Sequence, residues 1–292
     1  MFMSWQIVML FQIIVSSVMT IFSRKLALAD RKLFYVIGVC SYAMVAVMGI
    51  IYTLVFQGGV TGLPSAEGWL YIVVEGICIP ASWLLLYKLI GIIGASNSMI
   101  VSLMNTMTTA FLGIVLLREP LTLMFLAGAA LLLASGYLAL TTQADTEHHR
   151  RVALGKKIGL IAGMVALYAA GMYSEKQAID TIGVWDYAAF GWSMQFVGAI
   201  VICALFGRSE FVHVKRVSVH KGLLLGFMTS IAGVLYIYAL SIGTLSHTVV
   251  ANSGRVGLTM VLAALLLGEH NSLGRRATAL LLSVAGIALL FV

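Results

Sequence analysis

Charged residues are scarce in this chain. Only 10% of its 292 residues are Asp, Glu, Lys or Arg, whereas a soluble domain carries about 25%. Hydrophobic residues make up 61% of the chain, and the mean hydropathy is +1.03. These values exclude a water-soluble globule. The low charge and the long apolar runs also exclude a disordered chain and a nucleic-acid-binding surface.

Cysteine is also rare, and the usual signatures of catalysis are missing. Cys40, Cys78 and Cys203 are odd in number and lie inside apolar runs, so we interpret them as small buried hydrophobic residues. The loop histidines lack the spacing of metal ligands. Nucleotide-binding glycine motifs and a serine nucleophile elbow are absent. We therefore expect no enzymatic activity, no metal site and no cofactor, and we exclude ATP-driven pumping by this chain.

Long hydrophobic runs fill the sequence instead. A helix needs about 20 apolar residues to cross a bilayer core about 30 Å thick, and helices satisfy their own backbone hydrogen bonds in lipid. The sequence therefore predicts an all-α membrane protein, multi-pass in the lipid bilayer of the cell (plasma or inner) membrane. Ten transmembrane helices are expected, over residues 4–23, 33–56, 68–87, 95–117, 120–141, 157–176, 184–206, 222–243, 246–267 and 272–292.

The basic residues predict an orientation. Fifteen of the 18 lysines and arginines lie on the side reached after odd-numbered spans, whereas Arg118 and Lys176 lie on the other side and Arg255 lies inside a span. Basic residues near span ends are retained in the cytoplasm. Both termini are therefore predicted to lie outside.

The two halves of the chain resemble each other. An offset of 150 residues aligns the third to fifth spans with the eighth to tenth, and it pairs Glu119 with Glu269 and Gly136 with Gly286. Transporters are often built from two such repeats. Because each half has five spans, an odd number, the two repeats are predicted to be inverted with respect to each other.

Together these features resemble a known family. The predicted organisation is a first five-helix repeat over 1–142, a connecting loop over 143–156 and a second five-helix repeat over 157–292. Leu-Leu-Arg-Glu-Pro-Leu-Thr at 116–122 and Leu-Leu-Gly-Glu at 266–269 recur at matching places in the two repeats. This pattern is similar to the EamA-type branch of the drug/metabolite transporter superfamily. The resemblance implies a secondary transporter of small metabolites, many relatives being exporters of amino acids or related compounds, with both termini generally placed in the cytoplasm, the reverse of the charge count.

Arg255 is the first candidate for a functional residue. It lies near the middle of the span 246–267, where insertion of an arginine costs about 2.5–3.5 kcal/mol. One interpretation is that Arg255 lines a cavity and binds a substrate carboxylate or phosphate. The other is a static ion pair with Glu75 of the third span. The two are compatible if Glu75 holds Arg255 until an anionic substrate competes.

Other polar and aromatic residues lie at similar depths and predict a binding pocket. Asn105 is the repeat counterpart of Arg255, and Asn252 shares its helical face. Packing or interfacial roles are the alternative for the aromatic residues. The further candidates for substrate binding are Trp83, Tyr168, Trp192, Gln195 and Tyr236.

Glu119 and Glu269 lie at helix boundaries, where a carboxylate faces the positive end of the following helix dipole. Pro120 suits the first position of that helix. We therefore predict a structural role for both carboxylates.

The function predicted from these features is alternating-access transport of a small metabolite, such as an amino acid or related carboxylated compound, by an exporter or exchanger. One alternative is a transporter of lipophilic or small organic cations that uses Glu75. An alternative of another class is a non-transporting membrane scaffold. The expected partners are the small-molecule substrate, the bilayer and a coupling proton or counter-substrate, with no nucleic acid; the chain is expected to be a monomer or homodimer.

Overall fold

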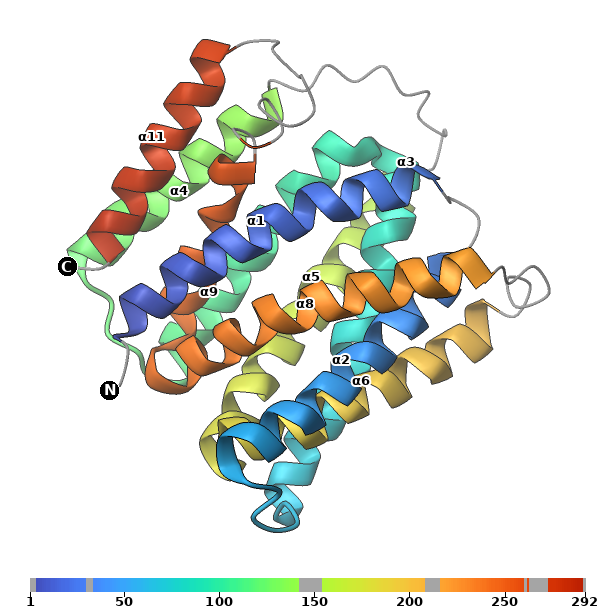
Figure 1. The fold of residues 1–292 in the computed structure, drawn as a ribbon. Coiled ribbons are helices and arrows are strands. Elements are labelled where there is room, and N and C mark those ends of the chain that lie inside the picture. Colours follow the sequence, from blue (N-terminus) through green and yellow to red (C-terminus); the bar gives the residue numbers. More distant parts are fainter. Residues whose placement is uncertain are drawn as a thin grey trace. The chain divides into compact units, whose positions relative to one another are not determined.

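The computed structural model describes residues 4–29, 34–141, 154–207, 216–259, 262 and 273–290, and within them every regular element is a helix. The helices are α1 (Trp5–Ala29), α2 (Phe34–Gln57), α3 (Ala66–Leu116), α4 (Leu123–Thr141), α5 (Leu154–Ile182), α6 (Val184–Phe206), α8 (Arg216–Ile242), α9 (Leu245–Ser253) and α11 (Leu273–Leu290) (Figure 1).

Among the described residues, four stretches of helix are long and apolar enough to cross a membrane. They cover Tyr35–Gln57, Ile158–Ile182, Val184–Phe206 and Val219–Ile242. Such lengths match the thickness of a hydrocarbon core at about 1.5 Å per residue. Shorter apolar stretches are Trp5–Ile21, Met104–Leu116, Leu123–Ser135 and Ala277–Leu290. The protein therefore has the helices of an all-α membrane protein, whereas ten separate spans remain a prediction.

Two predicted boundaries differ from the structure. The spans 68–87 and 95–117 were expected to be separate, but α3 runs through both as one helix of 51 residues. The intervening segment 88–94 contains no proline, so nothing in its local chemistry ends the helix. The opposite occurs in the predicted span 246–267, where α9 ends at Ser253 and a turn at Gly254 interrupts the helix.

The chain divides into two compact units that do not follow its two sequence halves. Unit 1 comprises Met1–Val18, Ser82–Ala169 and Gly243–Val292, and unit 2 comprises Met19–Ala81 and Ala170–Ile242. Each unit thus combines segments from both predicted repeats. The predicted domain limits themselves stay predictions, and most of the connecting loop 143–156 lies outside the described residues.

In unit 2, α2 packs between α6 and α8 (Figure 1). Glycines permit the close approach of these helices. A Cβ atom at Gly49 would collide with the carbonyl oxygen of Ala188 on α6, and one at Gly226 would collide with that of Ser41 on α2. Small residues at such contacts let membrane helices approach closely, because lipid provides no hydrophobic force between them.

In unit 1, α4 packs antiparallel to α11. A Cβ at Gly128 would lie 2.9 Å from the carbonyl oxygen of Gly286, and one at Gly286 would lie 2.9 Å from that of Gly128. One to two turns away, the hydroxyls of Ser135 and Ser283 are 2.7 Å apart. The fifth and tenth predicted spans, which the sequence predicts to be repeat counterparts, therefore contact each other along small residues.

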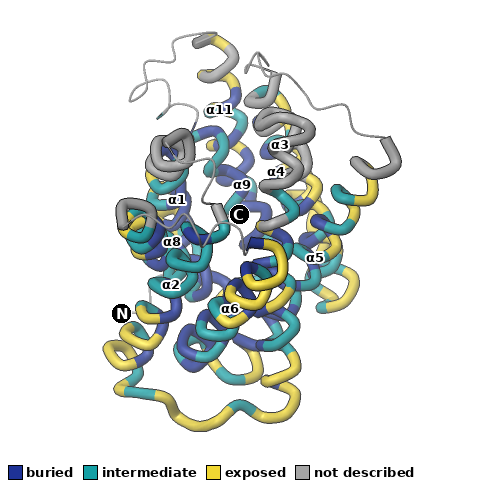
Figure 2. Tube along the Cα trace, turned by 90° about the vertical axis from the view of Figure 1, so that its right-hand side faces the viewer, coloured by how far each residue is buried: buried dark blue, intermediate teal, exposed yellow. Residues whose placement is uncertain are grey.

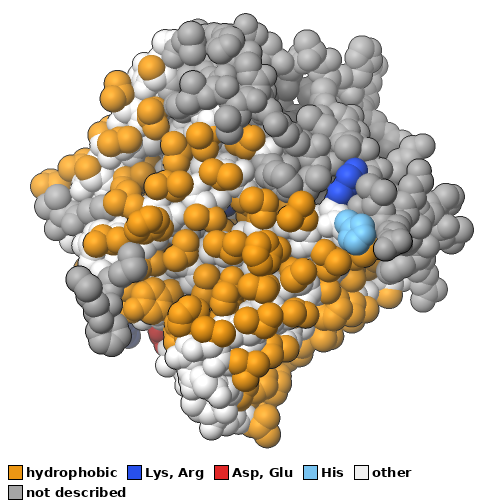
Figure 3. Space-filling view, in the orientation of Figure 1, with side chains coloured by type: hydrophobic (Ala, Val, Ile, Leu, Met, Phe, Trp, Pro, Cys, Tyr) orange, Lys and Arg blue, Asp and Glu red, His pale blue; other side chains and the backbone are white. Residues whose placement is uncertain are grey.

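The exposed sides of the helices are apolar. Figure 2 shows buried and exposed positions interleaved along the helices, and Figure 3 shows that hydrophobic side chains dominate the described part of one face. On α2 the exposed side chains include Val47, Ile50, Leu54 and Val55. A contiguous apolar surface of this kind is rare on a soluble monomer and fits a lipid environment.

Candidate functional site

Unit 2 contains a buried cluster of acidic and hydrogen-bonding side chains, which we call the acid cluster: Glu75, Glu175, Tyr187 and Gln195. The Tyr187 hydroxyl lies 3.1 Å from Glu75 Oε1 and 3.0 Å from Glu175 Oε1. The Gln195 amide donates a short hydrogen bond to Glu75 Oε1. All four residues are buried, and Glu75 and Tyr187 are 0% exposed. The cluster thus joins α3, α5 and α6 inside unit 2.

Glycines next to the acid cluster bring its helices together. On α3 and α6, a Cβ at Gly198 would collide with the carbonyl oxygen of Gly76, the residue after Glu75. On α5, a Cβ at Gly171 would lie 2.6 Å from the Ile79 side chain of α3. This close packing brings Glu75 within hydrogen-bonding distance of groups on α6 and fixes where its carboxyl lies.

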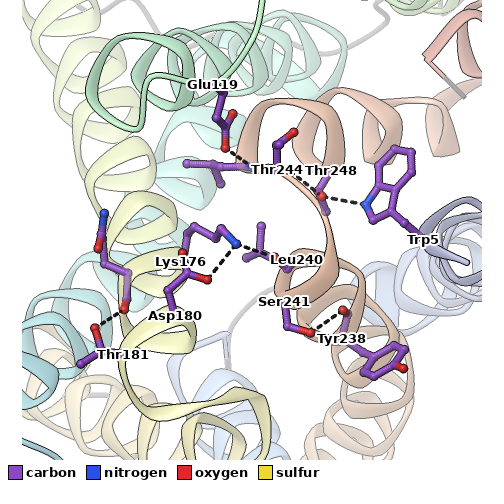
Figure 4. A network of polar contacts seen from close by, with 12 residues as sticks. Trp5, Glu119, Lys176, Asp180, Thr181, Tyr238, Leu240, Ser241, Thr244 and Thr248 are labelled. Carbon is purple, nitrogen blue, oxygen red and sulfur yellow. Dashed lines mark hydrogen bonds and ion pairs between the residues drawn. The ribbon is translucent and has the colours of Figure 1, made fainter. Parts of the chain in front are cut away.

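Lys176, the cation nearest in sequence to Glu175, contacts groups outside the acid cluster. Lys176 Nζ forms an ion pair with Asp180 at 2.8 Å and donates to the carbonyl oxygen of Leu240 at 3.0 Å (Figure 4). Consecutive residues of a helix point about 100° apart, so Glu175 and Lys176 serve different neighbours. Lys176 therefore supports the last turn of α8.

Unit 1 contains the interruption at Gly254, which lies between Asn252 and Arg255. The Gly254 N–H bonds to the carbonyl of Ala251 at 3.0 Å, in place of the partner one residue further back that an α-helix uses. Helical backbone resumes at Arg255, whose carbonyl oxygen accepts a hydrogen bond of 3.2 Å from Ser17 on α1. The Arg255 residue is half-buried.

Buried amide groups accompany this interruption. Gln12 of α1 donates to Ser16 Oγ at 2.8 Å and to Asn252 Oδ1 at 3.1 Å, and we call these three residues the amide cluster. Within the described part of unit 1, four buried oxygen atoms have no hydrogen-bond partner. They are Gln12 Oε1, Asn105 Oδ1, Thr109 Oγ1 and Thr259 Oγ1.

Glu119 has a structural role, but at a different helix from the expected one. Its carboxylate accepts the backbone N–H groups of Leu245 at 2.5 Å and Ser246 at 2.8 Å. Figure 4 shows Glu119 beside Thr244, the residue before α9. It therefore caps the start of α9 and not the start of α4, which follows it in the chain. Gly113 leaves room for this carboxylate, because a Cβ there would lie 2.6 Å from Glu119 Oε2. Glu269, its predicted repeat counterpart, lies outside the described residues.

The predicted substrate-binding residues divide between the two units. Glu75 and Gln195 are brought together in the acid cluster, and Asn252 belongs to the amide cluster. Because Arg255 belongs to unit 1 and Glu75 to unit 2, their ion pair stays a prediction. The other candidates are placed as follows: in unit 1, Asn105 is buried, Tyr168 half-buried and Trp83 exposed; in unit 2, Trp192 and Tyr236 are buried.

Trp192 illustrates the packing role that was the alternative for aromatic residues. Its indole would contact a Cβ at Gly49 at 2.9 Å and one at Gly233 at 3.2 Å, and its ring lies edge-on to Tyr52. The indole thus fills space left by glycines on α2 and α8. Its role as a substrate contact stays a prediction.

Two members of the acid cluster were not found from the sequence. Glu175 lies at the end of the predicted span 157–176, where a charge is unremarkable, but α5 continues to Ile182 and buries it. Tyr187 lies near the start of α6, where an aromatic residue suggests an interfacial position. If the predicted span 157–176 had been extended to Ile182, where α5 ends, Glu175 would have been recognised as an acid inside a membrane helix.

Comparisons with known proteins identify the fold alone. No family model matches the sequence, and no curated protein matches it. One solved structure, described as "Crystal structure of protein", superposes with a TM-score of 0.75 over 98% of this chain and 95% of that chain. The two sequences are 16% identical. This chain therefore shares its fold with that protein over nearly its whole length.

Proposed function

We propose that this protein is a secondary transporter that moves a small metabolite, such as an amino acid or related carboxylated compound, by alternating access. The observation that carries the proposal is the local departure from α-helical hydrogen bonding at Gly254, between Asn252 and Arg255, where the backbone stays in the right-handed helical region. Transporters often place irregular helical backbone beside their substrate sites near the middle of the membrane. By the sequence, Arg255 lies about ten residues, or roughly 15 Å, from the nearer end of its predicted span.

Polar side chains of unit 1 suit an amino acid. A guanidinium forms paired, charge-assisted hydrogen bonds with a carboxylate. Gln12 Oε1 and Asn105 Oδ1 are buried acceptors that lack a donor among the described residues of unit 1. Buried polar groups are nearly always hydrogen-bonded, so an acceptor left open needs a donor from a ligand or water. A substrate ammonium group supplies such donors, and its carboxylate suits Arg255.

Transport by purified protein tests the proposal. The protein is reconstituted into liposomes, and counterflow of labelled amino acids is measured with wild type and with Arg255→Lys. We expect counterflow of one carboxylated substrate, reduced about 10- to 100-fold by the lysine, because a charge-assisted hydrogen bond contributes about 1.5–3 kcal/mol. Arg118→Lys is the matched control, because Arg118 is exposed in the connection after α3.

Other outcomes separate the alternatives. Equal counterflow by the Arg255→Lys and Arg118→Lys proteins contradicts the role of Arg255. Counterflow of organic cations, abolished by Glu75→Gln and unaffected by Arg255→Lys, identifies a cation transporter instead. Failure to move any amino acid, organic cation or sugar identifies a scaffold.

A further inference from the structure

We propose that the acid cluster of unit 2 is a proton-binding site, in which Glu75 and Glu175 share one exchangeable proton through the Tyr187 hydroxyl. A role of this proton as the coupling ion rests on the transport function proposed above. Binding of the proton to the acid cluster does not depend on that function, and it can be measured separately.

Counting the hydrogen atoms in the cluster leads to this inference. A tyrosine hydroxyl has one hydrogen to donate, but the Tyr187 oxygen lies within hydrogen-bonding distance of both Glu75 Oε1 and Glu175 Oε1. If both carboxyls are ionised, one of these contacts brings two oxygen lone pairs together without a hydrogen. One added proton on a carboxyl turns that contact into a second hydrogen bond, in which the carboxylic acid donates to the Tyr187 oxygen.

The second oxygen of Glu75 is an independent sign of a missing proton. Glu75 Oε2 is fully buried and has no hydrogen-bond partner among the described residues. An ionised carboxylate oxygen without a donor is among the most unfavourable groups to bury, whereas the carbonyl oxygen of a neutral acid is much less so. The proton is therefore assigned mainly to Glu75, with Glu175 as the ionised partner that accepts the Tyr187 hydrogen.

The described hydrogen-bond partners in the acid cluster carry no positive charge. Glu75 Oε1 contacts the Tyr187 hydroxyl and the Gln195 amide of α6, and the same hydroxyl contacts Glu175 of α5. Two carboxylates in one site repel each other, and a shared proton relieves the repulsion.

The oxygen atoms of the acid cluster suit a proton better than a metal ion. A hard cation such as Ca²⁺ takes 6–8 oxygen ligands. In the described part of the chain, no group of three or more His, Cys, Asp or Glu side chains is arranged to hold a metal ion.

The proposed exchange is a simple balanced step. A proton from water binds the Glu75 carboxylate and forms an O–H bond that donates to the Tyr187 oxygen, while the Tyr187 O–H donates to the Glu175 carboxylate. Release returns the proton to water and leaves two carboxylates that compete for one hydroxyl. A transporter that alternates between these two states binds and releases one proton per cycle.

Infrared spectroscopy of the purified protein tests for this proton without any transport assay. The carbonyl stretch of a protonated carboxyl is followed against pH in H₂O and in D₂O. We expect a deuterium-sensitive band that titrates in wild type and is lost in Glu75→Gln, which removes the carboxyl that carries the proton. Glu175→Gln is expected to keep the band but to move its titration, because it removes the charge that repels the Glu75 carboxylate. Tyr187→Phe is expected to shift the band, because it removes the hydroxyl between the two carboxyls.

Glu67→Gln is the matched control. Glu67 lies on the same helix, α3, but is exposed, and its only described partner among side chains is the Tyr71 hydroxyl at 3.3 Å. The band is expected to survive this substitution. A wild-type protein without the band, or a band that survives Glu75→Gln, overturns the proposal.

Transport measurements then test the coupling. A gradient of one pH unit is expected to drive about tenfold substrate accumulation per proton exchanged in wild type. Glu75→Gln should lose this response but keep counterflow, since counterflow needs no net proton movement. Accumulation driven by Na⁺ in place of the pH gradient overturns the coupling. A titrating band without transport leaves the proton site standing and contradicts the proposed function, and transport without the band does the reverse.

Discussion

The two units bury polar groups of opposite kinds. In unit 2 the acid cluster holds two carboxyls, a hydroxyl and an amide in one connected network, with more acceptors than hydrogens to satisfy them. In unit 1 the buried groups are neutral amides and hydroxyls, and several of their oxygens have no partner among the described residues. One bound proton would satisfy the Tyr187 contacts of unit 2, whereas the open oxygens described in unit 1 would need several donors.

The difference suggests that the two units have separate roles. A missing proton needs only access to water, and dense packing around Glu75 is compatible with it. Missing donors for separate amide oxygens need a molecule of some size or several waters. We therefore interpret unit 2 as the carrier of the coupling ion and unit 1 as the carrier of the substrate-binding side chains. The predictions below test whether packing and charge in the two units differ in this way.

The largest expected effect concerns the glycine contact beside the acid cluster. Gly198→Ala places a methyl group onto the carbonyl oxygen of Gly76, which is rigid backbone, whereas Gly286→Ala in unit 1 meets the Gly128 carbonyl oxygen at 2.9 Å. Overpacking costs about 1–3 kcal/mol, and we expect Gly198→Ala at or above the top of this range. Thermal melting in detergent measures the loss, which should be smaller for Gly286→Ala.

Gly38→Ala is the control for these two substitutions. A Cβ at Gly38 meets nothing within 4 Å, and alanine is favoured over glycine in a helix. Its melting temperature should equal or exceed that of wild type. Equal stability of the Gly198→Ala and Gly38→Ala proteins would show that α3 and α6 do not approach as closely as described.

A smaller effect is expected from neutralising carboxylates in the two units. Glu119 of unit 1 accepts two backbone N–H groups at the start of α9, so Glu119→Gln removes a charge and one acceptor and should destabilise the protein by about 2 kcal/mol. Glu175→Gln removes a buried charge, while its amide oxygen can still accept the Tyr187 hydrogen, so this substitution should leave stability unchanged or higher. Thermal melting of both variants at neutral pH measures the change in stability, which we expect to be a loss only for Glu119→Gln. Equal losses of stability in the two variants would contradict the shared proton.

The sequence predicted the helical class and many helix limits well. The predicted span 184–206 coincides with α6, because Gly183 and Gly207 flank an uninterrupted apolar run. Gly183 has a φ of 85°, which favours glycine at that boundary. The continuity of α3 and the break at Gly254 were missed, because charged residues marked the predicted limits while the helices are set by tertiary packing.

The candidate site was predicted less completely. Hydropathy singled out Glu75 and Arg255 as charged residues inside spans, and the structure confirms that Glu75 is fully buried. The partners of Glu75 depend on how α3, α5 and α6 are rotated about their axes, which a single sequence does not fix. For the same reason the sequence predicted that Glu119 caps a helix, but it assigned the wrong helix.

The smallest expected effect concerns the serine pair of unit 1. Ser135 Oγ donates to the Ala279 carbonyl oxygen at 2.6 Å and lies 2.7 Å from Ser283 Oγ, whose hydroxyl can donate to it across the α4–α11 contact. Hydrogen bonds between membrane helices contribute about 0.6 kcal/mol on average, because the unfolded chain in the membrane finds other partners. A double-mutant cycle of Ser135→Ala and Ser283→Ala, followed by thermal melting, should give a coupling of this size. A coupling of several kcal/mol would mean that unit 1, like unit 2, depends on a closed polar network, and it would remove the contrast from which the two roles are inferred.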